Sequence, residues 1–402
     1  MSAPTGHPGA EPSPPRSNVI LLGWVAFWSG MSQEMIYPLL PTFVVLALGS
    51  SRAVLGAIEG ALVVGVVIAR VITARLLDRD ASPRRLTRAS YYVSLVSRPL
   101  MSLAPTIGVV GALRIADGLG KGGKDAPRDT LVAADAEVGA AGRSFGIQRT
   151  LDTLGSVAGP MAAGAVLLVA GHGEHGLRIA FALAALPAVA AALALRRVHD
   201  APPPPREPNR ARPKLSRPFV LLLAAVTLFG LANSSDTLLL LRARDAGLSA
   251  AQLAFAYAAF NLAYAALAIP AGALSDRIGR RPLLLVAWGT YALVYAGFAY
   301  ADAAWQLWLL FVAYGLYFAA AEGTLKAWVS SLVPPERRGA AYGLFAIASG
   351  ALVLPASVLA GVLWDRYGPR PAFLLGAILA AAALAVVALS PGLRDAPAVA
   401  EG

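Results

Sequence analysis

Twelve long apolar stretches follow one another along this chain, and they constrain its fold more than any other feature. Hydrophobic residues make up 57% of the 402 residues and charged residues only 14%, whereas soluble domains carry about 25% charged residues. A helix of roughly 20 apolar residues crosses a bilayer and satisfies its own backbone groups there. We therefore expect an all-α integral membrane protein with twelve transmembrane helices. The spans are predicted at 19–46, 54–74, 89–105, 106–133, 144–170, 178–195, 218–241, 250–271, 283–300, 304–332, 340–364 and 371–390.

Lys and Arg residues are distributed unevenly between the two sets of connecting loops. The loops on one side, together with both ends of the chain, hold twenty of them, and the loops on the other side hold six. Because Lys and Arg accumulate in cytoplasmic loops, we predict a multi-pass protein of the cytoplasmic (inner) membrane with both termini in the cytoplasm. The net charge of +11 then reflects this topology. The lipid bilayer is an expected partner of the chain, and nucleic acid is not.

The longest hydrophilic segment divides the chain into two groups of six spans. It covers residues 196–217 and contains four consecutive prolines at 202–205, and Pro-rich linkers are semi-rigid and extended. The predicted organisation is a disordered cytoplasmic tail at 1–18, a six-helix bundle at 19–195, a cytoplasmic linker at 196–217, a second six-helix bundle at 218–390 and a cytoplasmic tail at 391–402.

The two halves repeat each other at a nearly constant offset. Gly118 and Gly315 are 197 residues apart, and the same offset sets Asp125 against Glu322. A constant shift of this kind indicates an internal duplication. Two pseudo-symmetric bundles with a site between them form a typical transporter architecture.

Three motifs lie at 114–120 (RIADGLG), 155–164 (GSVAGPMAAG) and 272–284 (GALSDRIGRRPLL). Together they resemble the major facilitator superfamily, and the resemblance covers nearly the whole chain after its N-terminal tail. The segment GALSDRIGRRPLL at 272–284 is similar to the family's cytoplasmic loop motif, although its first-half copy keeps only Asp78 and Arg79. The segment RIADGLG at 114–120 resembles the fourth-helix motif, whose arginine the family ties to proton coupling. The resemblance implies a monomeric secondary transporter of a small-molecule substrate that works by alternating access.

The third motif bears on the direction of transport. The segment GSVAGPMAAG at 155–164 resembles the family's fifth-helix motif, which is associated with antiporters, and its packing residues are Gly155, Gly159, Pro160 and Gly164. It implies proton-coupled efflux, with protons as the second partner. An importer of a nutrient or metal chelate with the same fold, and a non-transporting membrane receptor, are the alternatives. Enzymatic activity is not expected.

Several ionisable residues fall inside the predicted spans. Such a side chain costs roughly 2.5–3.5 kcal/mol on insertion scales, so it normally faces a partner or a wet cavity. Glu34 is a candidate for proton exchange, and a static ion pair with Arg98 or Arg114 is the alternative. Glu59 is assigned to solvation at the membrane interface. The residues predicted to act in substrate binding or proton coupling are Glu34, Arg98, Arg114, Asp117 and Asp236.

Span four carries charges of alternating sign at three- and four-residue intervals, which places them on one side of a helix. We interpret this stripe as the wall of an aqueous path that ends in a cytoplasmic gate, and an early end of the span followed by a loop is the alternative. Arg149 with Asp152, and Glu322 with Lys326, are expected to pair within their own helices. The predicted gate and loop-motif residues are Asp78, Arg79, Lys121, Lys124, Asp125, Arg128, Asp129, Arg149, Asp152, Asp276, Arg277, Gly279, Arg280, Arg281, Glu322 and Lys326.

The sequence offers little for metal or cofactor chemistry. The chain has no cysteine and four histidines, all in predicted tails or loops. Thiolate ligands and a cysteine nucleophile are therefore excluded. We predict no metal and no cofactor.

Overall fold

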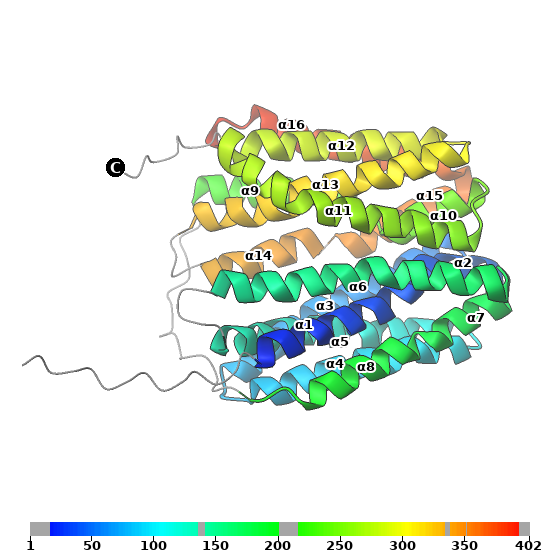
Figure 1. Cartoon of the computed structure of the whole chain (residues 1–402). Coiled ribbons are helices and arrows are strands. Elements are labelled where there is room, and N and C mark those ends of the chain that lie inside the picture. The colour runs from blue at the N-terminus through cyan, green and yellow to red at the C-terminus, as the bar shows by residue number, and fades with distance from the viewer. Residues whose placement is uncertain (1–16, 136–140, 201–215, 334–337, 351, 394–402) are drawn as a thin grey trace, which may run out of the picture.

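The computed structural model describes residues 17–135, 141–200, 216–333, 338–350 and 352–393, and every regular element in these ranges is a helix (Figure 1). Most of the predicted tails and linker, at 1–16, 201–215 and 394–402, lies outside the described residues. The first group of helices comprises α1 (Ser17–Ile36), η1 (Tyr37–Leu39), α2 (Leu40–Thr42), η2 (Phe43–Ala47), α3 (Arg52–Leu77), α4 (Pro83–Leu100), η3 (Met101–Leu103), α5 (Ile107–Ala134), α6 (Ala141–Ala170), α7 (Glu174–Leu183) and α8 (Ala185–Arg196). The second group comprises α9 (Arg217–Ala232), α10 (Asp236–Asp245), α11 (Ala250–Ile278), α12 (Arg280–Tyr300), α13 (Ala304–Ser331), α14 (Arg338–Gly350), α15 (Val353–Tyr367), α16 (Pro369–Leu389) and η5 (Pro391–Leu393).

Within the described residues these elements join end to end into twelve rods, and each predicted span coincides with one rod. Ten of the rods are long and apolar enough to cross a membrane. The other two are α4, which contains four arginines, and α5, which contains seven charged residues. They pack against each other, and α5 also packs against α3. The predicted all-α membrane fold is confirmed.

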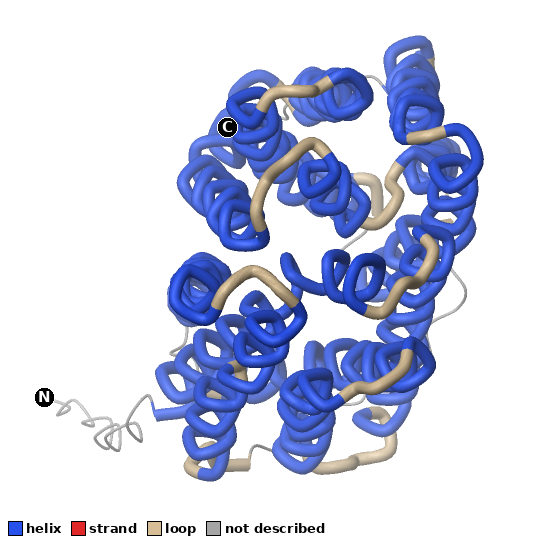
Figure 2. The backbone as a smooth tube through the Cα atoms, turned by 90° about the vertical axis from the view of Figure 1, so that its right-hand side faces the viewer, coloured by secondary structure: helices blue, strands red, loops and turns tan. Residues whose placement is uncertain are grey.

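The rods form two groups that lie side by side (Figure 2). Between the groups the most extensive packing joins α3 to α15 and α6 to α11. Glycine makes the α3–α15 contact close, because a Cβ atom on Gly56 would overlap the backbone of Ser357, and one on Gly361 would lie 2.6 Å from Cα of Ala53. The groups therefore meet backbone to backbone where the first half of α3 crosses the middle of α15.

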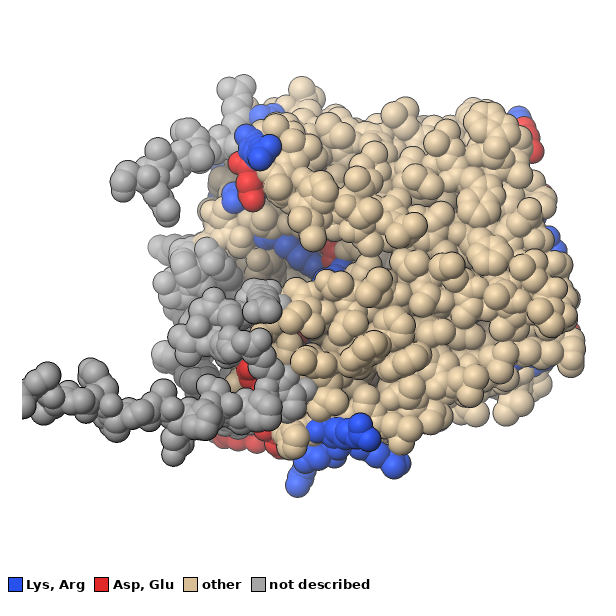
Figure 3. Space-filling model, viewed as in Figure 1, with Lys and Arg blue, Asp and Glu red and all other residues tan. Residues whose placement is uncertain are grey.

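The described ends of the chain lie together at one end of the molecule. The start of α1 and the end of α16 share the left-hand end of Figure 1, which we call the terminal end. Two contacts bring further segments there: the Asn18 backbone N–H donates to Oδ2 of Asp135 (2.9 Å), and the Asn18 side chain donates to the carbonyl of His199 (3.3 Å). On the face drawn in Figure 3, charged side chains gather at the two ends and in a hollow near the terminal end.

The first rod of each group contains an irregular segment. The first changes from α-helix to a 3-10 turn at Tyr37–Leu39 and to a π-helix at Phe43–Ala47, where Pro38 and Pro41 remove backbone donors. The corresponding rod of the second group breaks at residues 233–235, between α9 and α10. Both irregular segments lie next to the cavity described below.

Candidate substrate cavity and inner gate

A cavity of about 290 Å³ lies between the two groups of helices. The first group contributes side chains from α1, η1, α3 and α5, and the second contributes the break at 233–235 together with α10, α11, α13 and α15. Its polar lining consists of Gln33, Glu34, Glu59, Arg114, Asp117, Lys121, Asn233, Ser234, Ser235 and Asp236. Among the described residues, no three His, Asp or Glu side chains gather closely enough to hold a metal ion.

Four buried charges form a chain along one wall of the cavity. Arg114 makes a two-pronged ion pair with Glu59, at 2.7 and 2.8 Å, and a further contact of 3.2 Å with Asp117. The other Asp117 oxygen accepts from Nε of Arg98 at 2.8 Å. No side chain of the four is more than 5% exposed. We call Glu59, Arg114, Asp117 and Arg98 the charge quartet; its net charge is zero, and it ties α3, α4 and α5 together.

The assignment of Glu59 to solvation at the membrane interface was wrong. Its side chain is buried and is the principal partner of Arg114. The reason is geometric, because the two residues lie on different helices and only packing of α3 against α5 brings them together. A residue of the charge quartet was therefore missed at the level of sequence.

Glu34 lies at the cavity and forms no ion pair among the described residues, although Lys121 and Arg98 act on its charge through space. One carboxylate oxygen accepts from Nε2 of Gln33 at 2.8 Å, and the other is buried and has no hydrogen-bond partner. The Gln33 carbonyl oxygen in turn accepts from Arg98 at 3.0 Å. The static ion pair of Glu34 with Arg98 or Arg114 is therefore not formed, since both arginines are engaged within the charge quartet.

Asp236 faces the same cavity from the second group. It is the first residue of α10, directly after the N-cap Ser235, and one carboxylate oxygen accepts from the hydroxyl of Tyr314 at 2.6 Å. Lys121, on α5, lines the cavity with no hydrogen bond or ion pair in the described part of the chain. The structure thus places all five predicted substrate and proton-coupling residues on or directly behind one cavity, and it adds Glu59 and Lys121.

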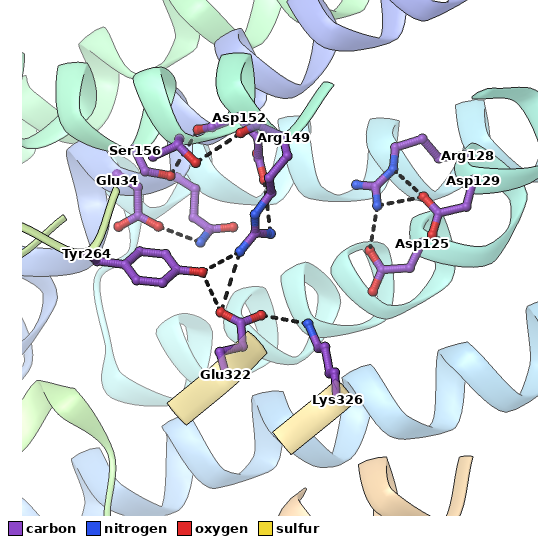
Figure 4. A network of polar contacts seen from close by, with 12 residues as sticks. Glu34, Asp125, Arg128, Asp129, Arg149, Asp152, Ser156, Tyr264, Glu322 and Lys326 are labelled. Atoms are coloured by element: carbon purple, nitrogen blue, oxygen red, sulfur yellow. Dashed lines mark hydrogen bonds and ion pairs between the residues drawn. The ribbon is translucent and has the colours of Figure 1, made fainter. Parts of the chain in front are cut away.

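Toward the terminal end, a polar bridge connects the two groups (Figure 4). Nη2 of Arg149, on α6, donates to the hydroxyl of Tyr264 at 2.7 Å and lies 3.5 Å from Glu322. Tyr264 donates to the same Glu322 carboxylate, which also pairs with Lys326 at 2.7 Å. Arg149 contacts Asp152 only at 3.9 Å. The predicted pairing of Glu322 with Lys326 is present, whereas the main partners of Arg149 lie across the interface between the groups. We call Arg149, Tyr264 and Glu322 the inner bridge.

The charged stripe continues along α5 beyond the cavity. Asp125 pairs with Arg70 of α3 at 2.7 Å, and Arg128 pairs with Asp129 at 2.9 Å. Because α5 remains helical to Ala134, the alternative of an early end followed by a loop is wrong. The stripe is not uniformly open to water, because its first members belong to the buried charge quartet.

The loop motif of the second half has a structural basis in its glycine. Gly279 joins α11 to α12 with φ +93°, a conformation that favours glycine. Arg281 follows and donates to the carbonyls of Val387 and Ala388 at the end of α16. In the first half the positive φ falls on Asp80, at +61°, next to the surviving Asp78–Arg79 pair.

The packing motif on α6 holds this helix close to its neighbours. A Cβ on Gly155 would overlap the carbonyl of Phe27, and one on Gly159 would lie 2.6 Å from the Met31 carbonyl and 2.9 Å from Cβ of Glu34. A Cβ on Gly164 would lie 2.8 Å from the ring of Phe255, which belongs to the second group. The motif therefore packs directly behind Glu34.

The fold and cavity define a multi-pass membrane transporter whose site lies between two helix groups. Residues 22–354 match the family model of the Major Facilitator Superfamily. The chain belongs to this family, and its transport therefore proceeds by alternating access. It is 32% identical over 376 residues to the uncharacterised MFS-type transporter MJ1317 of Methanocaldococcus jannaschii, covering 90% of this chain and 92% of that protein.

The chain is also similar to a second relative and to a solved structure. The uncharacterised protein Rv2265 of Mycobacterium tuberculosis is 30% identical over 334 residues, which cover 79% of this chain and 80% of that protein. Among solved structures, a point mutant of the nucleoside transporter NupG superimposes with a TM-score of 0.78 at 14% identity, covering 92% of this chain and 99% of the other. At this identity the likeness concerns the fold alone.

Proposed function

We propose that this chain is a proton-coupled exporter of a small solute, with Glu34 as the residue that exchanges the proton. The observation that supports this proposal most strongly is the state of its carboxylate. It is buried beside the cavity, bonded only to a neutral amide, and one of its oxygens has no partner. A carboxylate without a fixed cation can be neutralised by a proton or by a bound solute, and this competition is the basis of antiport.

The proposed transport cycle uses the two helix groups as its moving parts. In it, the chain works as a monomer in the cytoplasmic membrane with the terminal end in the cytoplasm. The bundles 19–195 and 218–390, tethered by the linker 196–217, rock against each other. The inner bridge lies between the cavity and this end, so exchange of its partners would open and close the inner gate. The close α3–α15 packing would separate when the cavity opens outward.

Outward transport is favoured by the position of the packing motif on α6. Its Gly159 lies against both Met31 and Glu34. Tight packing leaves no room for water behind the carboxylate, so protons would reach Glu34 only through the cavity. A proton and a solute would then compete for one route and one site, as antiport requires.

The experiment uses everted membrane vesicles from a bacterial expression host. Respiration acidifies their lumen and quenches acridine orange, and an exporter that takes up an added solute releases protons and restores the fluorescence. The added solutes are amino acids, amines, carboxylates, nucleosides and sugars. We expect at least one of them to restore fluorescence with the wild-type chain and none to do so with Glu34→Gln. The matched control is Glu174→Gln, at an exposed site far from the cavity.

Two results would refute this proposal. A response of Glu34→Gln equal to that of the wild type would remove the proton-exchange role of Glu34. Solute-dependent proton uptake by right-side-out vesicles, without any response in everted ones, would show import instead of export.

A further inference from the structure

The cavity contains three charged side chains that the charge quartet does not neutralise. Within the quartet, Glu59 and Asp117 balance Arg114 and Arg98 through contacts of 2.7–3.2 Å. Glu34, Lys121 and Asp236 remain. Among the described residues none of these three belongs to an ion pair, although Glu34 and Lys121 act on each other through space. The charges available to a solute are therefore one cation and two anions.

The three charges come from both sides of the interface. Glu34 on α1 and Lys121 on α5 belong to the first group of helices, and Asp236 on α10 belongs to the second. The free oxygen of Glu34 is buried and unpartnered, on a residue that is only 7% exposed. A buried, unsatisfied carboxylate oxygen costs free energy until a donor reaches it. The site therefore lacks a donor at Glu34 and an acceptor at Lys121.

Aromatic side chains complete the cavity. Tyr37 and Tyr257 lie with their ring centroids 5.4 Å apart, and Phe318 lines the same space. Aromatic faces attract a cation such as an ammonium group. A volume of about 290 Å³ is at the small end of ligand pockets, so the occupant is a small molecule.

We propose that the solute is a small zwitterion, such as an α-amino acid, whose ammonium group binds at Glu34 and Asp236 and whose acidic group binds at Lys121. This inference rests on the proposed transport function and specifies its substrate class. A simple cation would leave Lys121 without an acceptor, and a simple anion would add to two unpaired carboxylates. A zwitterion pairs with Lys121 through its acidic group and with Glu34 and Asp236 through its ammonium group. When the solute leaves, a proton takes the place of its ammonium group at Glu34.

The test measures binding, so its outcome does not depend on transport. The full-length chain, purified in detergent, is heated with each of the twenty common amino acids, glycine betaine or taurine. Each amino acid is accompanied by the amine that lacks its carboxylate and by the acid that lacks its amine. A ligand that binds the folded state raises the melting temperature. We expect one or more zwitterions to raise it and to bind roughly 10- to 100-fold more tightly than the matched amine and acid, as the loss of one charged hydrogen-bond partner implies.

Two variants assign the groups. Lys121→Met should bind the zwitterion no more tightly than the matched amine, and should still bind it more tightly than the matched acid. Asp236→Asn should still bind the zwitterion more tightly than the amine, and should lose its preference over the acid. Lys121→Arg should restore the preference over the amine, which separates a charge effect from misfolding. Glu174→Gln should leave both preferences unchanged.

Stabilisation only by amines, only by acids, or by none of the compounds would overturn the inference. Retention of both preferences in Lys121→Met would overturn it as well. If zwitterions bind as expected but the everted vesicles show no proton exchange, the proposed exporter fails and the substrate class stands. If proton exchange occurs with uncharged solutes only, the substrate class fails and the exporter stands.

Discussion

Replacing Asp117 by Asn should destabilise the protein strongly, because this residue occupies an inner position in the charge quartet. Its two oxygens contact Arg98 at 2.8 Å and Arg114 at 3.2 Å. With charge centres about 4 Å apart and an effective dielectric constant near 20, each pair contributes about 4 kcal/mol of Coulomb attraction. The lost desolvation of Asp117 and the lost repulsion from Glu59 offset part of this sum. Removing one partner of a buried pair has a net effect of about 3–5 kcal/mol on the free energy of unfolding.

A second substitution tests whether this loss comes from charge. In Asp117→Asn, Arg98 keeps only neutral partners, Ser29 and Gln33. Adding Arg98→Gln removes the unpaired cation and leaves the Glu59–Arg114 pair intact. Residues in one ion-pair network show coupling energies of about 0.5–3 kcal/mol. We therefore expect the free energy of unfolding of the double variant to be about 2 kcal/mol higher than that of Asp117→Asn.

In the assay, the fluorescently tagged chain is heated in detergent to a series of temperatures. The protein that stays folded is then measured as the height of its monodisperse peak in size-exclusion chromatography. The single variant should lose its monodisperse peak several degrees below the wild type, and the double variant should lie between them. A single variant that melts with the wild type, or a double variant no more stable than the single one, would refute the charge-quartet reasoning.

Two further predictions concern helix packing and the water path. Gly159→Ala should abolish proton exchange in everted vesicles, because the added methyl group would lie 2.6 Å from the Met31 carbonyl. Gly146→Ala, on the same helix with nothing within 4 Å, should retain activity, and equal activity of the two variants would contradict the packing argument. Because the chain has no cysteine, Lys121→Cys should react with a membrane-impermeant thiol reagent, whereas Leu119→Cys, on the outer surface of α5, should be protected by lipid. Equal labelling at both positions would show that α5 does not separate water from lipid in this way.

The positions of the spans were predictable because the bilayer leaves the backbone little choice. A long apolar segment has to satisfy its own hydrogen bonds, and a helix does so without reference to the rest of the chain. The irregularity of the first rod near Pro38 and Pro41 was predictable for the same local reason. The break between α9 and α10 was not predicted, because no proline marks residues 233–235 and the stretch around them is apolar.

The partners of the charged residues were much harder to predict. Spacing along one helix indicated that Glu322 and Lys326 could pair, and they do. The same reasoning placed Arg149 with Asp152, but the shorter contacts of Arg149 run to another helix group. Contacts between helices depend on depth and rotation in the bundle, which periodicity within one segment does not determine.

The polarity of α4 and α5 has a consequence for the biosynthesis of this protein. By length and composition, neither helix is among the ten described ones that could cross a membrane, and each buried charge raises the cost of insertion by roughly 2.5–3.5 kcal/mol. Arg114 and Asp117 contact each other within α5, and Glu59 of α3 and Arg98 of α4 supply their closer partners. We therefore expect α4 and α5 to insert together with α3 and not one at a time, since the partners that neutralise their buried charges lie on these neighbouring helices.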